Sequence, residues 1–442
     1  MMFNKHVLFS TLAIVFVMLA VTSIPSTMGL VAEASAPSGR IHSNASLAAA
    51  SHLGSELQIS LPTVPECDRY KPAIAYNYRH DEYLVVWHNT WPNGHRDIYA
   101  RRVSGDGQLR SWFAVSAGNN DRAEPAVAYN ATTDEYLVVW MYNANGDGFT
   151  YEIWGRTIAW NGAYQDAEFQ IITWPNRTFW TPRVVWNGWR NEYLVVWSAF
   201  DATTFLATDV AHAILDSDGN KLHGTIISST DLPHQADVAY NIASEAYLVV
   251  WRYMTGANGN IRGARVDADS GLVVNPPGEF VISSASDDEQ FPAVTTNTQD
   301  RYLVVWQRHV LGDWDIYGRE LDVAGNLLGG DIYISTFSAI DEIYPDVAAW
   351  PGPGRDFLVV WQENAASGEE IQAIRWGDMP SERIEVAAAA FWNNAQPAVD
   401  RGRPGALIVY EGDSKGDPTV YRHIYGREWS PNAMFLPLVL RQ

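Results

Sequence analysis

An apolar pentapeptide, Tyr-Leu-Val-Val-Trp, recurs along the chain. It occurs five times unchanged, a sixth copy begins with Phe, and a seventh is degraded. The copies are Tyr83–Trp87, Tyr136–Trp140, Tyr193–Trp197, Tyr247–Trp251, Tyr302–Trp306, Phe357–Trp361 and Ala406–Tyr410. Their last residues are 53, 57, 54, 55, 55 and 49 positions apart. A repeat of this length indicates a modular architecture in which each copy is one supersecondary unit.

Each repeat predicts four short strands. A segment like Pro125–Asn130 precedes the pentapeptide, a segment like Asp315–Arg319 follows it, and a run such as Phe113–Ser116 closes the unit. These runs are rich in β-branched and aromatic residues and are separated by Gly, Asn and Asp, which favour turns. Four short strands in about 50 residues are typical of a propeller blade.

The pentapeptide is apolar on both faces of a strand. Tyr, Val and Trp alternate with Leu and Val, so no face is left for water. Such a strand must be covered on both sides. We therefore expect it in the middle of a blade, with a neighbouring blade packed against each face.

The blade count follows from an unpaired strand at the N-terminal side. The seventh repeat has strands near 397–400, 406–410 and 423–427 but no clear fourth. An isolated strand-like run, Leu57–Ser60, stands before the first repeat. Adding it to the last blade closes the ring and removes exposed sheet edges. The sequence thus predicts an all-β fold, a seven-bladed β-propeller with four antiparallel strands per blade.

The N-terminus resembles an export signal. Lys5 and His6 precede an apolar run, and small residues follow at Ala32, Ala34 and Ala36. We expect a signal peptide at 1–36, a linker at 37–54, the propeller at 55–429 and a C-terminal tail at 430–442. The alternative is that the signal is kept as an anchor. The prediction is a secreted protein, extracellular or at the cell surface.

Charge and cysteine content restrict the partners. The formal net charge of −21 opposes binding to nucleic acid and to anionic membranes. A single cysteine, Cys67, permits no intramolecular disulfide. We expect no membrane span after signal cleavage, and a monomer.

One face of the ring is expected to carry the binding residues. The connections after the second and fourth strands vary in length and hold aromatic residues outside the repeat consensus. The ligand-binding candidates there are Trp91, His95, Tyr142, Trp174, Trp180 and Trp314. Their rings could stack on sugars or anchor a protein. The alternative is that they only cover the ends of the blades.

An acidic position recurs four residues before the Pro of the first strand. Its copies are Asp68, Asp121, Asp288 and Asp341. The preferred interpretation is a turn in which the carboxylate accepts backbone N–H groups. The alternative is a carboxylate ring that binds a hard cation such as Ca²⁺. We otherwise expect no cofactor.

The repeats resemble those of exported bacterial propeller proteins with blades of this pentapeptide type, over about residues 55–429. They lack the paired glycines of kelch and the signature of WD40 blades, and the sialidase box has only a partial counterpart at Ser104–Asp106. No local catalytic motif appears. The favoured function is therefore a binding module that recognises a glycan or an extracellular protein. The alternative is a polysaccharide hydrolase or lyase with an axial active site.

Overall fold

Seven four-stranded antiparallel sheets make up the part of the chain that the computed structural model describes. The predicted signal peptide at 1–36, residues 37–52 of the predicted linker and the tail at 430–442 lie outside this part. Within it, no helix has the length and apolar character needed to cross a bilayer. The described residues are 53–60, 67–274, 278–297, 299–335, 339–350, 355–366, 368–377, 382–387, 394–402, 405–413 and 421–429.

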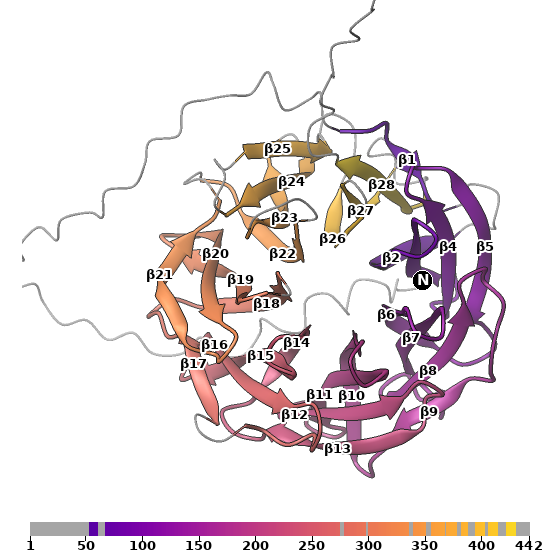
Figure 1. Cartoon of the computed structure of the whole chain (residues 1–442), viewed down its shortest axis with the longest axis horizontal. Coiled ribbons are helices and arrows are strands. Elements are labelled where there is room, and N and C mark those ends of the chain that lie inside the picture. The colour runs from indigo at the N-terminus through magenta and orange to yellow at the C-terminus, as the bar shows by residue number, and fades with distance from the viewer. Residues whose placement is uncertain are drawn as a thin grey trace, which may run out of the picture. The chain divides into compact units, whose positions relative to one another are not determined.

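The sheets form the blades of a propeller, with the first strand of each blade innermost and the fourth outermost (Figure 1). Blade 1 contains β2 (Asp68–Asn77), β3 (Glu82–Thr90), β4 (Arg96–Ser104) and β5 (Leu109–Ser116). Blade 2 contains β6 (Arg122–Asn130), β7 (Glu135–Tyr142), β8 (Glu152–Ala159) and β9 (Phe169–Ile172). Blade 3 contains β10 (Arg177–Asn187), β11 (Glu192–Asp201), β12 (Ala207–Asp216) and β13 (Lys221–Ser228).

The remaining blades follow the same order. Blade 4 contains β14 (His234–Asn241), β15 (Ala246–Thr255), β16 (Asn258–Asp267) and β17 (Glu279–Ser283). Blade 5 contains β18 (Glu289–Thr296), β19 (Arg301–Val310), β20 (Asp313–Asp322) and β21 (Leu327–Tyr333). Blade 6 contains β22 (Glu342–Ala349), β23 (Phe357–Ala365), β24 (Gly368–Trp376) and β25 (Glu382–Ala387). Blade 7 contains β26 (Ala395–Arg401), β27 (Ala406–Gly412), β28 (His423–Trp429) and β1 (Leu57–Gln58). The predicted fold class is confirmed.

The second strand of each blade is buried on both faces, as expected. In blade 2, Tyr136, Val138 and Trp140 pack against the second strand of blade 1. Leu137 and Val139 of the same strand pack against the second strand of blade 3. One apolar cluster fills each of the seven contacts between neighbouring blades. The core is therefore divided into wedges between blades.

Each innermost strand carries a β-bulge at the residue before its Pro or its equivalent. These seven residues have φ between 46° and 56°, and the strand pairing shifts register there. The left-handed conformation costs energy for a non-glycine residue. Neighbouring blades stabilise the bulge in several cases, because its N–H is donated to the residue after the preceding pentapeptide. Lys71 N thus lies 2.8 Å from Glu411 Oε1, and Tyr344 N lies 2.9 Å from Gln307 Oε1.

Three carboxylates bridge the inner edges of adjacent blades. An innermost strand has no sheet partner on its axial side, so some of its N–H groups need other acceptors. Asp237, Asp346 and Asp400 each accept one, at 2.8 Å, from the first strand of the following blade. The donors are Val294, Val399 and Tyr76, respectively.

The N-terminal strand closes the ring. Leu57 and Gln58 pair with Gly426 and Tyr425 of β28 in antiparallel register. Ile59 is fully buried in the cluster between blades 7 and 1, together with Leu407 and the first-blade pentapeptide. The predicted closure by this strand is confirmed.

Deleting residues 53–60 should destabilise the whole ring, because the edge of β28 becomes exposed and Ile59 leaves its cluster. We expect the melting temperature to fall by at least about 10 °C, or the protein to aggregate. Differential scanning calorimetry would compare the deletion variant with a chain that begins at Leu53. Equal melting of the two chains would contradict closure by β1.

Replacing Trp140 by Ala should leave a cavity between blades 1 and 2, since the side chain is fully buried. The expected loss is about 3–5 kcal/mol in the free energy of unfolding, measured with urea. The Trp189→Ala variant is the control, because 65% of that residue is exposed and its loss should change little. A loss below about 1 kcal/mol for Trp140→Ala would contradict the packing described for the second strand.

Candidate functional site

The blade connections divide the ring into two faces. Since the strands are antiparallel, connections after the first and third strands lie at one end, here called the hairpin face. Connections after the second and fourth strands lie at the other end, here called the loop face. Second-to-third connections differ on the loop face: they span 143–151 in blade 2 but 311–312 in blade 5.

Three of the six ligand-binding candidates lie on strands, although all were expected in loops. Tyr142 is the last residue of β7, Trp180 lies in β10 and Trp314 lies in β20. Pairing continues beyond the pentapeptide, so that His309 of β19 faces Trp314 across the hairpin. Only Trp91, His95 and Trp174 lie in loops.

Trp91, His95 and Tyr142 gather at the contact between blades 1 and 2. The Trp91 indole N–H donates to Asp97 Oδ2 over 2.8 Å, and His95 Nε2 lies 3.0 Å from Asp97 Oδ1. The Arg122 guanidinium lies 3.8 Å from the same carboxylate and 4.8 Å from the centre of the Tyr142 ring. Asp97 is buried. This arrangement holds the 91–95 loop against the next blade.

A second group, here called the aromatic row, crosses blades 2 to 4 on the loop face. Ring centres are 6.2 Å apart for Phe149–Phe205, 6.5 Å for Phe205–Trp180, 4.6 Å for Trp180–Phe200 and 6.4 Å for Phe200–His234. Phe149 and Phe205 are 53% and 41% exposed. The row therefore presents aromatic surface to solvent at one end and is anchored in the blades at the other.

The other two ligand-binding candidates, Trp174 and Trp314, belong to neither of these two groups. Trp174 is exposed and its ring centre is 6.3 Å from that of the buried Phe179. Trp314 belongs to blade 5 and packs against His309 at 5.1 Å. The six candidates thus occupy several separate places on the loop face.

Three apolar residues on the loop face are both exposed and in the left-handed conformation. Phe205, Leu232 and Leu311 have φ of 57°, 50° and 55°. Leu311 is 99% exposed and Leu232 is 42% exposed. A bulky residue with positive φ is strained, and such strain concentrates at functional positions. The left-handed conformation of these residues was not predicted, because φ cannot be read from residue type.

The recurring acidic residues bind the preceding blade instead of forming a turn of their own. Asp288 accepts from Arg252 Nη2 at 2.7 Å and from Gly259 N at 2.6 Å. Asp341 accepts the N–H of Trp314 at 3.1 Å, Asp68 that of Arg422 at 2.9 Å, and Asp121 pairs with Arg96. Over the described stretches of chain, no group of three or more His, Cys, Asp or Glu residues is arranged to hold a metal ion.

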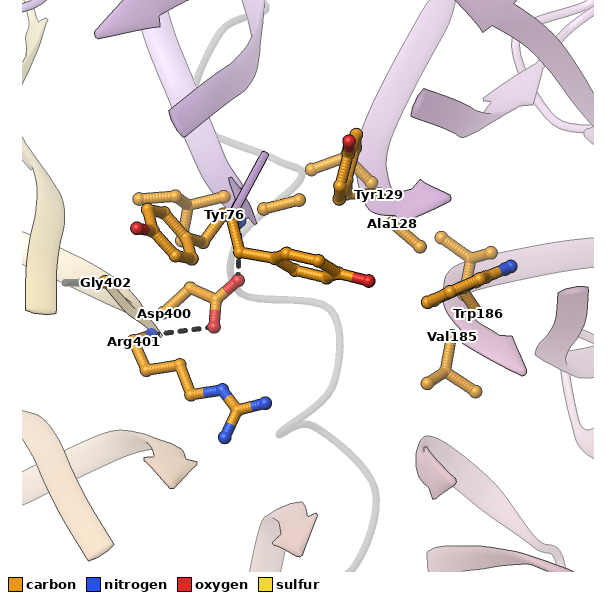
Figure 2. Close-up of a pocket in the computed structure, with 13 residues that line it drawn as sticks. Tyr76, Ala128, Tyr129, Val185, Trp186, Asp400, Arg401 and Gly402 are labelled. Carbon is orange, nitrogen blue, oxygen red and sulfur yellow. Dashed lines mark hydrogen bonds between the residues drawn. The ribbon is translucent and has the colours of Figure 1, made fainter. Parts of the chain in front are cut away.

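A cavity of about 640 Å³ lies near the axis, at the hairpin-face end of the inner strands. Blades 1, 2, 3 and 7 line it (Figure 2). Tyr76, Tyr129 and Trp186 give it an aromatic wall, and Asp400 and Arg401 give it a charged side. Sequence analysis missed this site. Arg401 occupies the repeat position that Tyr76 and Tyr129 hold in blades 1 and 2, so a blade-by-blade alignment would have marked it.

Acidic groups with raised pKa values are spread over several blades. Burial raises the pKa of Glu342 to about 8 and those of Glu411 and Glu428 to about 7. Glu342 lies in blade 6, 3.8 Å from the Arg383 guanidinium, and Glu411 accepts from Arg422 across 3.1 Å in blade 7. Of the described residues that line the cavity, only Asp400 is a carboxylate. The carboxyl groups with raised pKa values therefore do not form a catalytic pair in the axial cavity.

The comparisons with known proteins show the fold. No family model matches the sequence, and no curated protein matches it. The β-propeller domain of the Trilobed protease from Pyrococcus furiosus, which has an open velcro topology, is 11% identical, with a TM-score of 0.50 and coverage of 83% of this chain and 96% of that chain. The endosialidase of phage phi92 is 7% identical, with a TM-score of 0.50 and coverage of 89% and 71%. The Dos1 propeller is 10% identical, with a TM-score of 0.47 and coverage of 86% and 95%.

Replacing Glu342 by Gln should remove part of the pH dependence of stability. Burial raises the pKa of the Glu342 carboxyl from 4.5 to about 8. Stability is thus lost as the pH rises from about 4.5 to about 8, because the unfolded chain releases this proton first. Between pH 6 and 9 the wild type should lose on the order of 2 kcal/mol more than the variant. Urea titrations at both values measure this, with the exposed Glu385→Gln as control. Parallel curves for wild type and Glu342→Gln would contradict the burial effect.

Proposed function

We propose that this protein is an exported binding module that recognises a glycan through its loop face, with the aromatic row as the contact surface. The observation that carries the proposal is the exposed end of that row, formed by Phe149 and Phe205. Aromatic faces stack on the apolar faces of sugar rings and contribute binding energy at low conformational cost.

The strained residues at the loop tips also favour the loop face as the binding surface. Phe205 belongs to the aromatic row, and the carbonyl of Leu232 contacts His234 at its end. Both residues are held exposed in a conformation that Gly or Asn would adopt more easily. Folding alone would favour a small polar residue at both positions. Exposed apolar side chains under backbone strain are better explained by contact with a partner.

The alternative function, a polysaccharide hydrolase or lyase, has weaker support. Hydrolysis of a glycosidic bond generally needs two carboxylates on opposite sides of the scissile bond. The described lining of the axial cavity contributes one, Asp400, and that cavity lies at the hairpin-face end of the inner strands. Both oxygens of Asp400 already accept backbone N–H groups.

The double variant Phe205→Asn, Leu232→Asn tests the proposed surface without harming the fold. Asn tolerates positive φ, so the melting temperature should stay equal or rise slightly. Binding to the glycan found on an array should weaken by about tenfold or more, because an exposed stacking ring and an apolar neighbour are lost. Isothermal titration calorimetry would measure the affinity.

Trp189→Ala is the matched control, because this exposed ring lies on the hairpin face after β10. It should leave the affinity unchanged. If the control lost binding and the double variant kept it, the assignment to the loop face would be wrong. If the loop face bound a protein and no glycan, the proposed class of partner would be wrong. Turnover of a polysaccharide would favour the alternative function, a hydrolase or lyase.

A further inference from the structure

The axial cavity has the size and chemistry of a site for a small ligand. Its volume of about 640 Å³ falls within the usual range for such sites, about 300–1,000 Å³. It lies at the opposite end of the inner strands from the loop face. Isoleucine, valine and alanine residues of the first three blades form its apolar surface. The cavity is therefore separate from the surface proposed above.

The aromatic wall is held rigidly from the hairpin side. The Tyr76 hydroxyl donates to Asp81 Oδ1 over 2.7 Å, and the Tyr129 hydroxyl donates to Asp134 Oδ1 over 2.7 Å. The Trp186 indole N–H donates to Asn191 Oδ1 over 3.4 Å. The polar atoms of these rings are thus engaged with their own hairpins. What the wall can offer a ligand is the faces and edges of the rings, which suit a flat apolar surface.

Arg401 breaks the pattern of the repeat at this site. The equivalent position is Tyr76 in blade 1, Tyr129 in blade 2 and Trp186 in blade 3. Arg401 is exposed, and it forms no ion pair with any carboxylate that the structure describes. Figure 2 shows its guanidinium and the Trp186 ring on opposite sides of the cavity. The guanidinium is therefore positioned beside the cavity without a structural partner of its own.

Asp400 does not cancel this positive charge in the way that an ion pair would. Its Oδ2 accepts the N–H of Tyr76 at 2.8 Å, and its Oδ1 accepts the N–H of Arg401 at 2.7 Å. Burial raises the pKa of Asp400, while the hydrogen bond from Tyr76 and the nearby Arg401 guanidinium lower it. The carboxyl serves the backbone, and the guanidinium donors remain for a ligand.

We infer that the axial cavity binds an acidic sugar, a pyranose ring that carries a carboxylate. The ring would stack on the aromatic wall of blades 1 to 3, and the carboxylate would pair with the Arg401 guanidinium. Arginine presents two parallel N–H donors that match a carboxylate, so it selects for that group. A neutral sugar would leave the guanidinium unused, and a cation would be repelled by it.

The test is a titration of the full chain with D-galacturonate and D-glucuronate, with D-galactose and D-glucose as neutral counterparts. Isothermal titration calorimetry should show saturable binding of at least one acid and much weaker binding of its neutral counterpart. Arg401→Gln should weaken binding of the acid by about tenfold or more, as for loss of one charge-assisted hydrogen bond. Arg401→Lys should recover part of the affinity, because it restores the charge without the fork.

Two controls separate this site from others. Arg79→Gln removes an exposed arginine from a hairpin outside the described cavity lining and should leave the affinity unchanged. Phe205→Asn, which alters the loop face, should also leave it unchanged, so failure here and failure of the proposed function are distinguishable. Absence of saturable binding to the wild type, equal binding of neutral sugars, or full binding by Arg401→Gln would each overturn the inference. The wild-type titration decides even if a variant fails to fold.

Discussion

The fold depends on burial of both faces of one strand. The second strand of each blade is covered by the preceding blade on its Tyr, Val and Trp side and by the following blade on its other side. No blade could bury this strand alone, because a single sheet leaves both of its faces in water. Both faces of all seven second strands are buried only when the ring is closed. The chain achieves this by placing β1 beside β28.

Contacts between neighbouring blades also account for several of the carboxylates in the ring. Asp237, Asp346 and Asp400 accept N–H groups from the unpaired inner edge of the next blade. The acidic residues that precede the first strands, such as Asp288, hold the third strand of the blade before. Raised carboxyl pKa values are often taken as a sign of catalysis. Here burial raises the pKa of Asp237, Asp346 and Asp400, while their hydrogen bonds to the next blade lower it.

Sequence periodicity predicted the fold because each repeat carries its own strand and turn signals. It predicted the blade count and the closing strand, since Leu57 and Gln58 complete the missing edge. It placed Tyr142, Trp180 and Trp314 in loops, whereas strand pairing continues past the pentapeptide and includes them. The axial cavity was missed, because residues distant in sequence, such as Trp186 and Arg401, line it from opposite sides. Such convergence across blades leaves no local motif.

The two proposed binding surfaces lie where the chain departs from its repeat, at the strained Phe205 on the loop face and at Arg401 by the axis. Both surfaces depend on a closed ring in which all seven contacts between neighbouring blades are packed alike. Hydrogen–deuterium exchange of the native protein measures this most directly. We expect the second strands of all seven blades, including β27, to exchange together and only on global unfolding. Earlier exchange of β27, β28 and β1 than of the other blades would contradict the account of the closed ring.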